Sequence, residues 1–185
     1  MLKQTLALIG LTLSLSANAG LILQQVSPTP TDYFLDVDFT SMTGSGVGNV
    51  VAFADPIDWD LGLGNSSTSG CEVSDFSSFT AGNIALLQRG ACTFRVKVEN
   101  AILSGAAGAL IFNQGDDSNR FGLANASLDL PPLSIPTLFT TYSVGTSLDD
   151  TVVRIMVPQT VPAPATLALF GLGLAGLGWS RRKKA

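Results

Sequence analysis

The sequence predicts a small α/β domain, and the observations that predict it lie in its central stretch, residues 82–114. Two short apolar runs, Ile84–Gln88 and Ala109–Asn113, have the length and the flanking residues of buried strands. Between them, apolar residues recur at spacings of three and four, which is typical of one face of a helix. A strand, a helix and a second strand most simply form a crossover between parallel strands.

The helix is expected to follow Thr93, whose hydroxyl can accept a hydrogen bond from an amide of the first turn. Arg95 and Glu99 would point away from the sheet. The helix would end near Gly105, where a glycine allows a positive φ. The residues expected to face the sheet are Phe94, Val98, Ala101, Ile102 and Gly105.

A set of spaced residues in and around this stretch follows one pattern. Its members are Arg89, Gly90, Cys92, Phe94, Lys97, Asn100, Ala101, Gly105, Ala106, Gly108 and Asn113, with Gly70, Cys71 and Phe76 before them and Ile135, Pro136, Gly145 and Leu148 after them. This pattern resembles the protease-associated (PA) domain over roughly residues 45–157. The resemblance implies a single domain with a β-barrel-like or sandwich sheet flanked by short helices. It also implies that the domain has no catalytic residues of its own and binds peptides or proteins, or shapes access to a neighbouring active site.

The part of the chain that lies between its N-terminal and C-terminal apolar segments is strongly acidic. Five of the ten basic residues and all fourteen acidic residues lie there, so this part carries a net charge of −9. Binding to nucleic acid needs clustered lysine and arginine, which excludes nucleic acid as the expected partner. The length left between the ends, about 140 residues, is enough for one core.

The chain begins with a typical export signal. Lys3 precedes the apolar run Leu6–Leu15, and the small residues Ala17 and Ala19 mark a cleavage site, so residues 1–19 are interpreted as a signal peptide cut between Ala19 and Gly20. An uncleaved anchor is the alternative reading. Residues 20–44 would form an N-terminal segment that serves as a linker or a first edge strand.

For residues 33–39 and for residues 44–48, a purely structural role competes with a ligand-binding role. Residues 33–39 alternate in polarity, which favours a strand with Asp36 and Asp38 on a solvated face rather than in a calcium site. The glycine-rich residues 44–48 are expected to form a turn before a strand at 49–54, because they lack the ending of a phosphate-binding loop.

Loops and short elements make up the rest of the domain. Residues 55–70 should form a loop held by Trp59 and Leu61, although an exposed tryptophan could also stack on a sugar. Asp116 and Asp117 are interpreted as solvated loop residues rather than a catalytic pair. A strand at 137–142, a short helix at 143–150 and a closing strand at 151–157 complete the prediction.

Cys71 and Cys92 are the only two cysteines. In an exported protein such a pair usually forms a disulfide, which for this loop length contributes about 3 kcal/mol. The sequence has no histidine. Zinc or copper would therefore lack ligands, and we expect no metal site and no cofactor.

The C-terminal segment, residues 158–185, carries a second pattern. A proline-containing motif of Val161, Pro162, Ala163 and Pro164 precedes the apolar, glycine-rich run 167–179, and Arg181–Lys184 add four cations near the end. This is a stop-transfer arrangement, with the cations on the cytoplasmic side. It is similar to the PEP-CTERM sorting signal of Gram-negative bacteria, which implies transient insertion of the tail in the inner membrane and processing by an exosortase. A permanent membrane anchor is the alternative.

These observations predict a protein without enzymatic activity. With no histidine and with both thiols expected in a disulfide, the sequence has no group to activate a serine or cysteine nucleophile. Lys97 would need a serine partner to act as a base. We expect an exported module that binds a protein or peptide at the cell surface, outer envelope or extracellular matrix. Two other roles remain open: a structural component of the exopolysaccharide matrix, and an accessory domain for a separately encoded protease.

Overall fold

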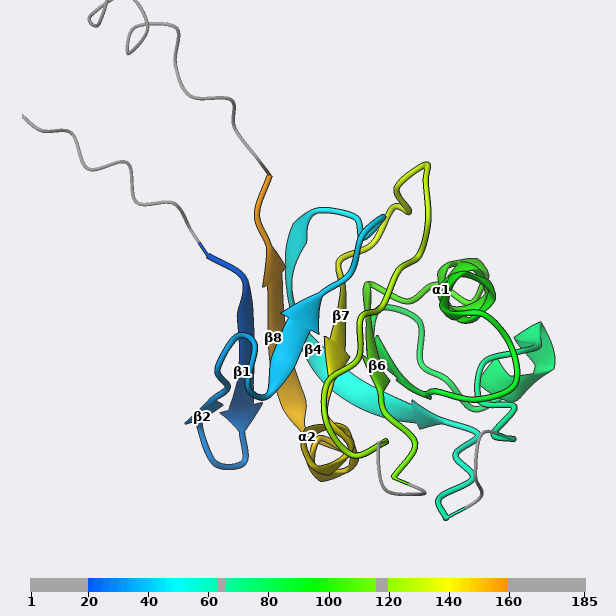
Figure 1. The fold of residues 1–185 in the computed structure, drawn as a ribbon, viewed down its shortest axis with the longest axis horizontal. Helices are drawn as coiled ribbons and strands as arrows, with labels where there is room; N and C mark the ends of the chain where they lie inside the picture. The colour runs from blue at the N-terminus through cyan, green and yellow to red at the C-terminus, as the bar shows by residue number, and fades with distance from the viewer. Residues whose placement is uncertain (1–19, 63–65, 116–119, 160–185) are drawn as a thin grey trace, which may run out of the picture.

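The computed structural model describes residues 20–62, 66–115 and 120–159. The strands are β1 (Ile22–Ser27), β2 (Thr31–Asp32), β3 (Phe39–Ser41), β4 (Gly48–Ile57), β5 (Ile84–Gln88), β6 (Gly108–Phe112), β7 (Thr137–Thr140) and β8 (Val152–Val157). The helices are the 3-10 turn η1 (Val73–Phe76), α1 (Phe94–Leu103) and α2 (Tyr142–Ser147). The strands form one curled, half-barrel sheet in the order β2-β1-β8-β4-β5-β6-β7-β3 (Figure 1). The predicted α/β class is confirmed.

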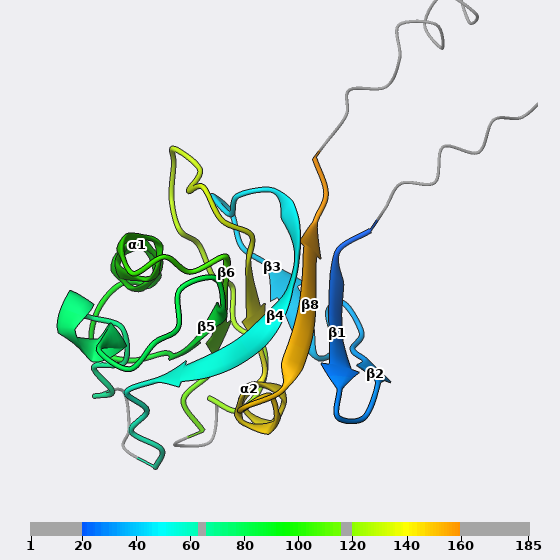
Figure 2. The ribbon, with the colours of Figure 1, turned by 180° about the vertical axis from the view of Figure 1, so that it is seen from behind.

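Strand β4 joins the two halves of the sheet. Its first residues pair with β8 in an antiparallel arrangement that continues to β1 and β2. Its last residues, from Ala54 to Ile57, pair in parallel with β5, which is followed by β6 and β7. Seen from behind, β4 curves from the antiparallel strands to the parallel ones (Figure 2). The domain therefore has a parallel centre, as predicted, and an antiparallel arm.

The parallel centre is buried on both faces, which explains why β5 and β6 are continuous apolar runs. One core cluster includes Phe76 of η1 and Val98 and Ala101 of α1, which pack with alternate sheet residues such as Ile111. The second includes Val144 of α2, on the other face. Helices α1 and α2 thus cover different parts of the sheet (Figure 1).

Helix α1 forms as its sequence predicts. The Thr93 hydroxyl accepts a hydrogen bond from the Val96 amide at 3.3 Å. Val98 and Ala101 are fully buried. After Ser104, the C-cap, Gly105 has a φ of +84°, and its amide donates to the Ile102 carbonyl.

The predicted strand at residues 33–39 is wrong. Between β2 and β3 the chain forms a turn, in which Asp36 has a φ of +62°. The Asp38 carboxylate accepts a hydrogen bond from the Phe34 amide at 2.9 Å, and the Asp38 amide donates to the Phe34 carbonyl. Aspartate favours such turns because its side chain bonds to nearby backbone and tolerates positive φ. The alternating polarity of residues 33–39 therefore belongs to a turn with exposed apolar residues and not to a strand.

The glycine-rich residues 44–47 form a turn, as predicted, that leads into β4 at Gly48 and packs against residues 129–137. The Ser45 hydroxyl accepts a hydrogen bond from the Thr137 amide at 2.8 Å, and the Gly46 amide donates to the Ile135 carbonyl at 3.0 Å. A Cβ on Gly46 would lie 2.7 Å from backbone atoms of Leu133 and Ile135. The glycine is needed here for close contact between two loops.

Arg95 has a structural role that the sequence did not reveal. It forms an ion pair with Glu99 at 2.8 Å, as its spacing allows. Its guanidinium also donates to the Leu128 carbonyl at 2.9 Å and the Pro131 carbonyl at 3.1 Å. Arg95 therefore connects α1 to the proline-containing loop that precedes β7.

Replacing Arg95 with methionine should release this loop. We expect the free energy of unfolding to fall by about 1 kcal/mol, because two carbonyl groups lose a charged donor. Hydrogen exchange should accelerate at the amides of Leu128 and Leu133, which donate to Thr43 and Gly44. Glu99→Gln is the matched control, since an exposed ion pair contributes little. Equal exchange in wild type and both variants would contradict this role.

Three predicted features lie outside the described residues: the signal peptide 1–19, the Asp116–Asp117 pair and the tail from residue 160. Across 20–62, 66–115 and 120–159, none of the helices has the length and hydropathy that a membrane span requires. The described chain starts and finishes at the same end of the sheet, where Ile22 of β1 pairs with Met156 of β8 (Figure 1).

Candidate functional site

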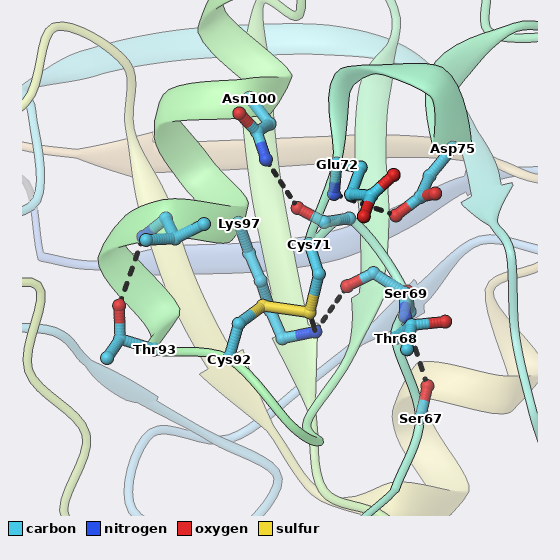
Figure 3. Close-up of a disulfide and its surroundings, with 12 residues drawn as sticks. Ser67, Thr68, Ser69, Cys71, Glu72, Asp75, Cys92, Thr93, Lys97 and Asn100 are labelled. Atoms are coloured by element: carbon cyan, nitrogen blue, oxygen red, sulfur yellow. Dashed lines mark hydrogen bonds between the residues drawn. A yellow bond between two sulfur atoms is a disulfide. The ribbon is translucent and has the colours of Figure 1, made fainter.

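The predicted disulfide between Cys71 and Cys92 is present. The two sulfur atoms are 2.10 Å apart, and the bond closes a sequence separation of 21 residues. Cys71 immediately precedes the cap of η1, and Cys92 immediately precedes the cap of α1. The bond therefore fixes the segment that carries η1 beside the first turn of α1 (Figure 3).

Lys97 of α1 lies directly behind this disulfide and is fully buried. Its ammonium group donates a hydrogen bond to the Ser69 carbonyl and lies 3.7 Å from the Cys71 sulfur (Figure 3). One turn later, the Asn100 amide donates to the Gly70 carbonyl at 3.0 Å. Burial lowers the pKa of Lys97 from 10.5 to about 8, and the charge of Asp75 opposes this shift.

The lowered pKa of Lys97 predicts how the free energy of unfolding depends on pH. Between about pH 8 and 10.5 the unfolded chain holds a proton on Lys97 that the folded chain has lost. The contribution of Lys97 to the free energy of unfolding should therefore rise as the pH rises through this window and reach its least favourable value below pH 8. Urea unfolding of wild type and Lys97→Met between pH 7 and 10 measures it. As the pH rises, the free energy of unfolding of wild type should increase relative to that of Lys97→Met. A difference between the two proteins that is independent of pH would contradict the lowered pKa of Lys97.

The other predicted motif residues hold loops at the edge of the sheet. Gly90 follows β5 and passes so close to Ser67 that a Cβ would lie 1.9 Å from the Ser67 carbonyl oxygen. Asn113 follows β6, is fully buried, and donates to the Gly122 carbonyl at 2.8 Å. Its side-chain oxygen accepts from Arg89 at 3.3 Å. Phe94 packs on Phe139 of β7, with ring centroids 5.6 Å apart.

A layer of buried amide side chains lies where β5 and β6 end. Gln88, Asn113 and Gln114 are each fully buried. The Gln88 side chain accepts from the Asp60 amide at 2.7 Å and donates to the Asp60 carbonyl at 3.2 Å. Arg120 donates to the Gln114 side-chain oxygen at 2.6 Å. These bonds hold the surrounding loops at the carboxyl ends of the parallel strands.

Four aromatic rings form a row at the same edge. Trp59 contacts Phe112 edge-on at 4.9 Å, and Phe112 lies 6.3 Å from Tyr142. Tyr142 in turn contacts Phe121 at 5.5 Å. Phe112 is fully buried, whereas Phe121 at the end of the row is 52% exposed. From the fully buried Phe112, the row therefore runs through Tyr142 to the surface at Phe121.

We call the outer part of this region the carboxyl-edge surface; it consists of Trp59, Arg89, Arg120, Phe121 and Tyr142. Trp59 is half-buried and donates to the Leu86 carbonyl at 2.7 Å, so its predicted role as a loop anchor is confirmed. Leu61 is 48% exposed, and its predicted role as an anchor is wrong. Trp59, by contrast, packs against the core cluster that contains Phe112.

The groups at this edge are suited to binding contacts. Aromatic rings and guanidinium groups held by buried amides can contact apolar side chains and carbonyl or carboxylate groups. Near Lys97, the hydroxyl of Ser69 donates to the Ile57 carbonyl and accepts from the Gln88 amide. Lys97 bonds to the carbonyl of Ser69 and not to this hydroxyl. Within the described ranges, no group of three or more histidine, cysteine, aspartate or glutamate residues could hold a metal ion.

Sequence reasoning did not single out Gln88, Gln114, Arg120 or Phe121. A signal was available, because polar residues directly follow two neighbouring parallel strands, and such strand ends meet at one edge of a sheet. The distance between residues 88 and 120 along the chain concealed their proximity.

Comparison with known proteins gives two family matches. Residues 48–148 match the PA domain, and residues 160–183 match the PEP-CTERM protein-sorting motif. An aminopeptidase of Pseudomonas aeruginosa is 45% identical over 130 residues, which are 70% of this chain and 24% of that protein. This chain thus spans about a quarter of the length of that relative.

Solved structures with a similar fold include two aminopeptidases. An aminopeptidase from Aneurinibacillus sp. strain AM-1 aligns with a TM-score of 0.54 and 20% identity, over 75% of this chain and 30% of the other. BSAP, a zinc aminopeptidase from Bacillus subtilis, aligns with a TM-score of 0.51 and 18% identity, over 74% and 29%. In each case the similarity covers less than a third of the longer protein.

Proposed function

Because this chain belongs to the PA-domain family and carries a PEP-CTERM sorting motif, we propose that it is a non-catalytic, exported module that binds a peptide segment at its carboxyl-edge surface. Both sequence resemblances are confirmed. The sorting motif implies export to the envelope and processing by an exosortase-type enzyme. The absence of enzymatic activity and the nature of the ligand are the parts we propose.

The composition supports a role without catalysis. The sequence has no histidine, and both of its cysteines form the disulfide. The Pseudomonas aminopeptidase shares only 24% of its length with this chain, so what the two proteins have in common is one domain. Partial desolvation and the neighbouring Asp150 raise the pKa of Asp149, but both residues lie in an exposed turn. The buried Lys97 bonds to the carbonyl of Ser69 and not to its hydroxyl.

The exposure of Phe121 is the observation that carries the binding proposal. A phenylalanine that is half exposed at the end of a packed aromatic row offers an apolar contact on a rigid base. Arg120 lies next to it and is held by the buried Gln114. The carboxyl ends of parallel strands are a common place for ligands because loops gather there around a fixed sheet.

A peptide selection tests this proposal. The mature protein, purified from the medium or envelope, is used to select from a random peptide library. Peptides enriched on wild type should bind Phe121→Ala at least about tenfold more weakly, as expected for an aromatic contact at an interface. Leu103→Ala is the matched control, because Leu103 is 73% exposed on α1 and outside the carboxyl-edge surface. No enrichment, or equal binding to both variants, would overturn the assignment of the surface.

The same protein also tests two alternatives to a non-catalytic peptide-binding module. Co-sedimentation with purified matrix polysaccharide, in place of peptide binding, would indicate a structural component of the matrix. Cleavage of the selected peptides that persists through purification would indicate an enzyme. Intact mass of the protein from envelope and medium fractions measures export separately: loss of residues 1–19 and of the segment after residue 160 is expected.

A further inference from the structure

We propose that the Cys71–Cys92 disulfide is a directional thiol-exchange site, in which Cys92 takes up an incoming thiol and Cys71 leaves as a thiolate beside the Lys97 ammonium group. The proposal is independent of ligand binding at the carboxyl-edge surface. It assigns a chemical role to a buried cation that the binding function does not use.

The two sulfur atoms have different electrostatic surroundings. Lys97 is fully buried, and its ammonium group lies 3.7 Å from the Cys71 sulfur. The same group donates to the Ser69 carbonyl, which fixes its position (Figure 3). Cys71 and Cys92 are both half-buried, and each has an exposed neighbour, Glu72 and Thr93. The two sulfur atoms therefore have similar access to solvent, and it is the contact of Cys71 with the Lys97 cation that distinguishes them.

The charge near each sulfur influences which of the two sulfur atoms of a disulfide leaves as a thiolate. A neighbouring cation stabilises a thiolate, and the sulfur with the more stable thiolate is the better leaving group. The other charged groups near Lys97 do not cancel its effect. Asp75 on η1 raises the pKa of Lys97 and so partly offsets the effect of burial, whereas Glu99 on α1 is paired with Arg95. Glu72 accepts a hydrogen bond from the Ser74 hydroxyl.

The exchange is balanced in two steps. An external thiolate forms a bond to the Cys92 sulfur, the bond between the two cysteines breaks, and its electron pair moves to the Cys71 sulfur. If the reductant is an exported dithiol, its second thiolate then attacks the mixed disulfide. The reductant leaves as its own disulfide, and Cys92 becomes a thiolate, so two electrons have passed from the dithiol to this protein. Reduction would release the segment carrying η1 from its covalent link to the start of α1.

Partial reduction of the mature protein tests the direction of exchange. The protein is treated briefly with limiting β-mercaptoethanol, a neutral monothiol, at pH 7 and is quenched with acid. Trypsin cleaves after Arg89, which separates Cys71 and Cys92 into different peptides. Mass spectrometry should find the adduct on Cys92 in about tenfold excess over Cys71. A majority of adduct on Cys71 would overturn the proposal.

Variants separate the effect of charge from that of access. In Lys97→Met the preference for Cys92 should fall to within about twofold, because steric access is unchanged while the cation is gone. Arg154→Met is the control, because it removes one positive charge at a position away from the disulfide. Arg154 lies on the antiparallel arm, where it bonds to Asn49. A preference that survives Lys97→Met would mean that access alone sets the direction.

A pH series on wild type keeps the test decisive if Lys97→Met fails to fold. The ratio of adduct on Cys92 to adduct on Cys71 does not depend on the concentration of the attacking thiolate. It should remain in favour of Cys92 from pH 6 to 7 and decline above about pH 8, where Lys97 loses its proton. A partition that is constant to pH 10 would contradict a role for Lys97.

Discussion

Replacing Gly90 with alanine is expected to lower the free energy of unfolding by about 3 kcal/mol, the upper end of what a forced backbone shift costs. Gly90 connects the end of β5 to the disulfide segment. A Cβ at this position would lie 1.9 Å from the Ser67 carbonyl oxygen and 2.7 Å from the Ser67 carbonyl carbon. Both are backbone atoms, so no side-chain rotation relieves the contact. The Ala91 amide, which donates to the Ser67 carbonyl at 2.9 Å, would also move.

Gly122→Ala is the matched control for this substitution. Gly122 lies in a loop of the same edge, and a Cβ there would meet no atom within 4 Å. Urea unfolding monitored by circular dichroism should show a lower midpoint for Gly90→Ala and a midpoint near wild type for Gly122→Ala. Equal midpoints for Gly90→Ala and wild type would mean that the Ser67 segment yields easily and is not fixed to β5.

Removal of the disulfide should have an effect of similar size. The double variant Cys71→Ala, Cys92→Ala is expected to lose about 3 kcal/mol, because a loop of about 20 residues is no longer closed in the unfolded chain. Protection from hydrogen exchange should fall most in η1 and the first turn of α1, the two elements that the bond joins.

Reduction of the wild-type protein provides the comparison for the double variant. Reduced wild type retains both sulfur atoms beside Lys97, so it should be at least as stable as the alanine pair. Unfolding curves for oxidised wild type, reduced wild type and the double variant, measured at one pH, give the three values. Coincident curves for all three would show that the segment is held by its hydrogen bonds to Lys97 and Asn100 alone.

The sequence predicts the centre of this fold well because local signals there agree with one another. The hydrophobic pattern, the Thr93 cap and Gly105 all indicate the same three elements, β5, α1 and β6. Outside this unit the signals conflict. Residues 33–39 have the polarity of a strand, but Asp36 and Asp38 bond to their own backbone and form a turn. A short-range side-chain bond decides the structure there, and polarity alone does not show it.

The candidate site was harder to predict than the fold. Its members come from segments that are far apart in the chain, and their proximity follows from the order of the strands. The order β8-β4-β5-β6-β7 places residues 59, 89, 114 and 142 at one edge. The disulfide was predictable because only two cysteines are present. The contact of Lys97 with Cys71 was not, because the helix period alone does not show which sulfur faces the lysine.

The most direct test of the proposed function combines binding and turnover in one sample. A peptide selected on the mature protein is titrated into that protein in a calorimeter, and the peptide mass is measured after a long incubation. We expect saturable binding to wild type, binding at least about tenfold weaker to Phe121→Ala, and a peptide of unchanged mass. A shortened peptide, or equal affinity for wild type and Phe121→Ala, would contradict a non-catalytic module that binds through its carboxyl-edge surface.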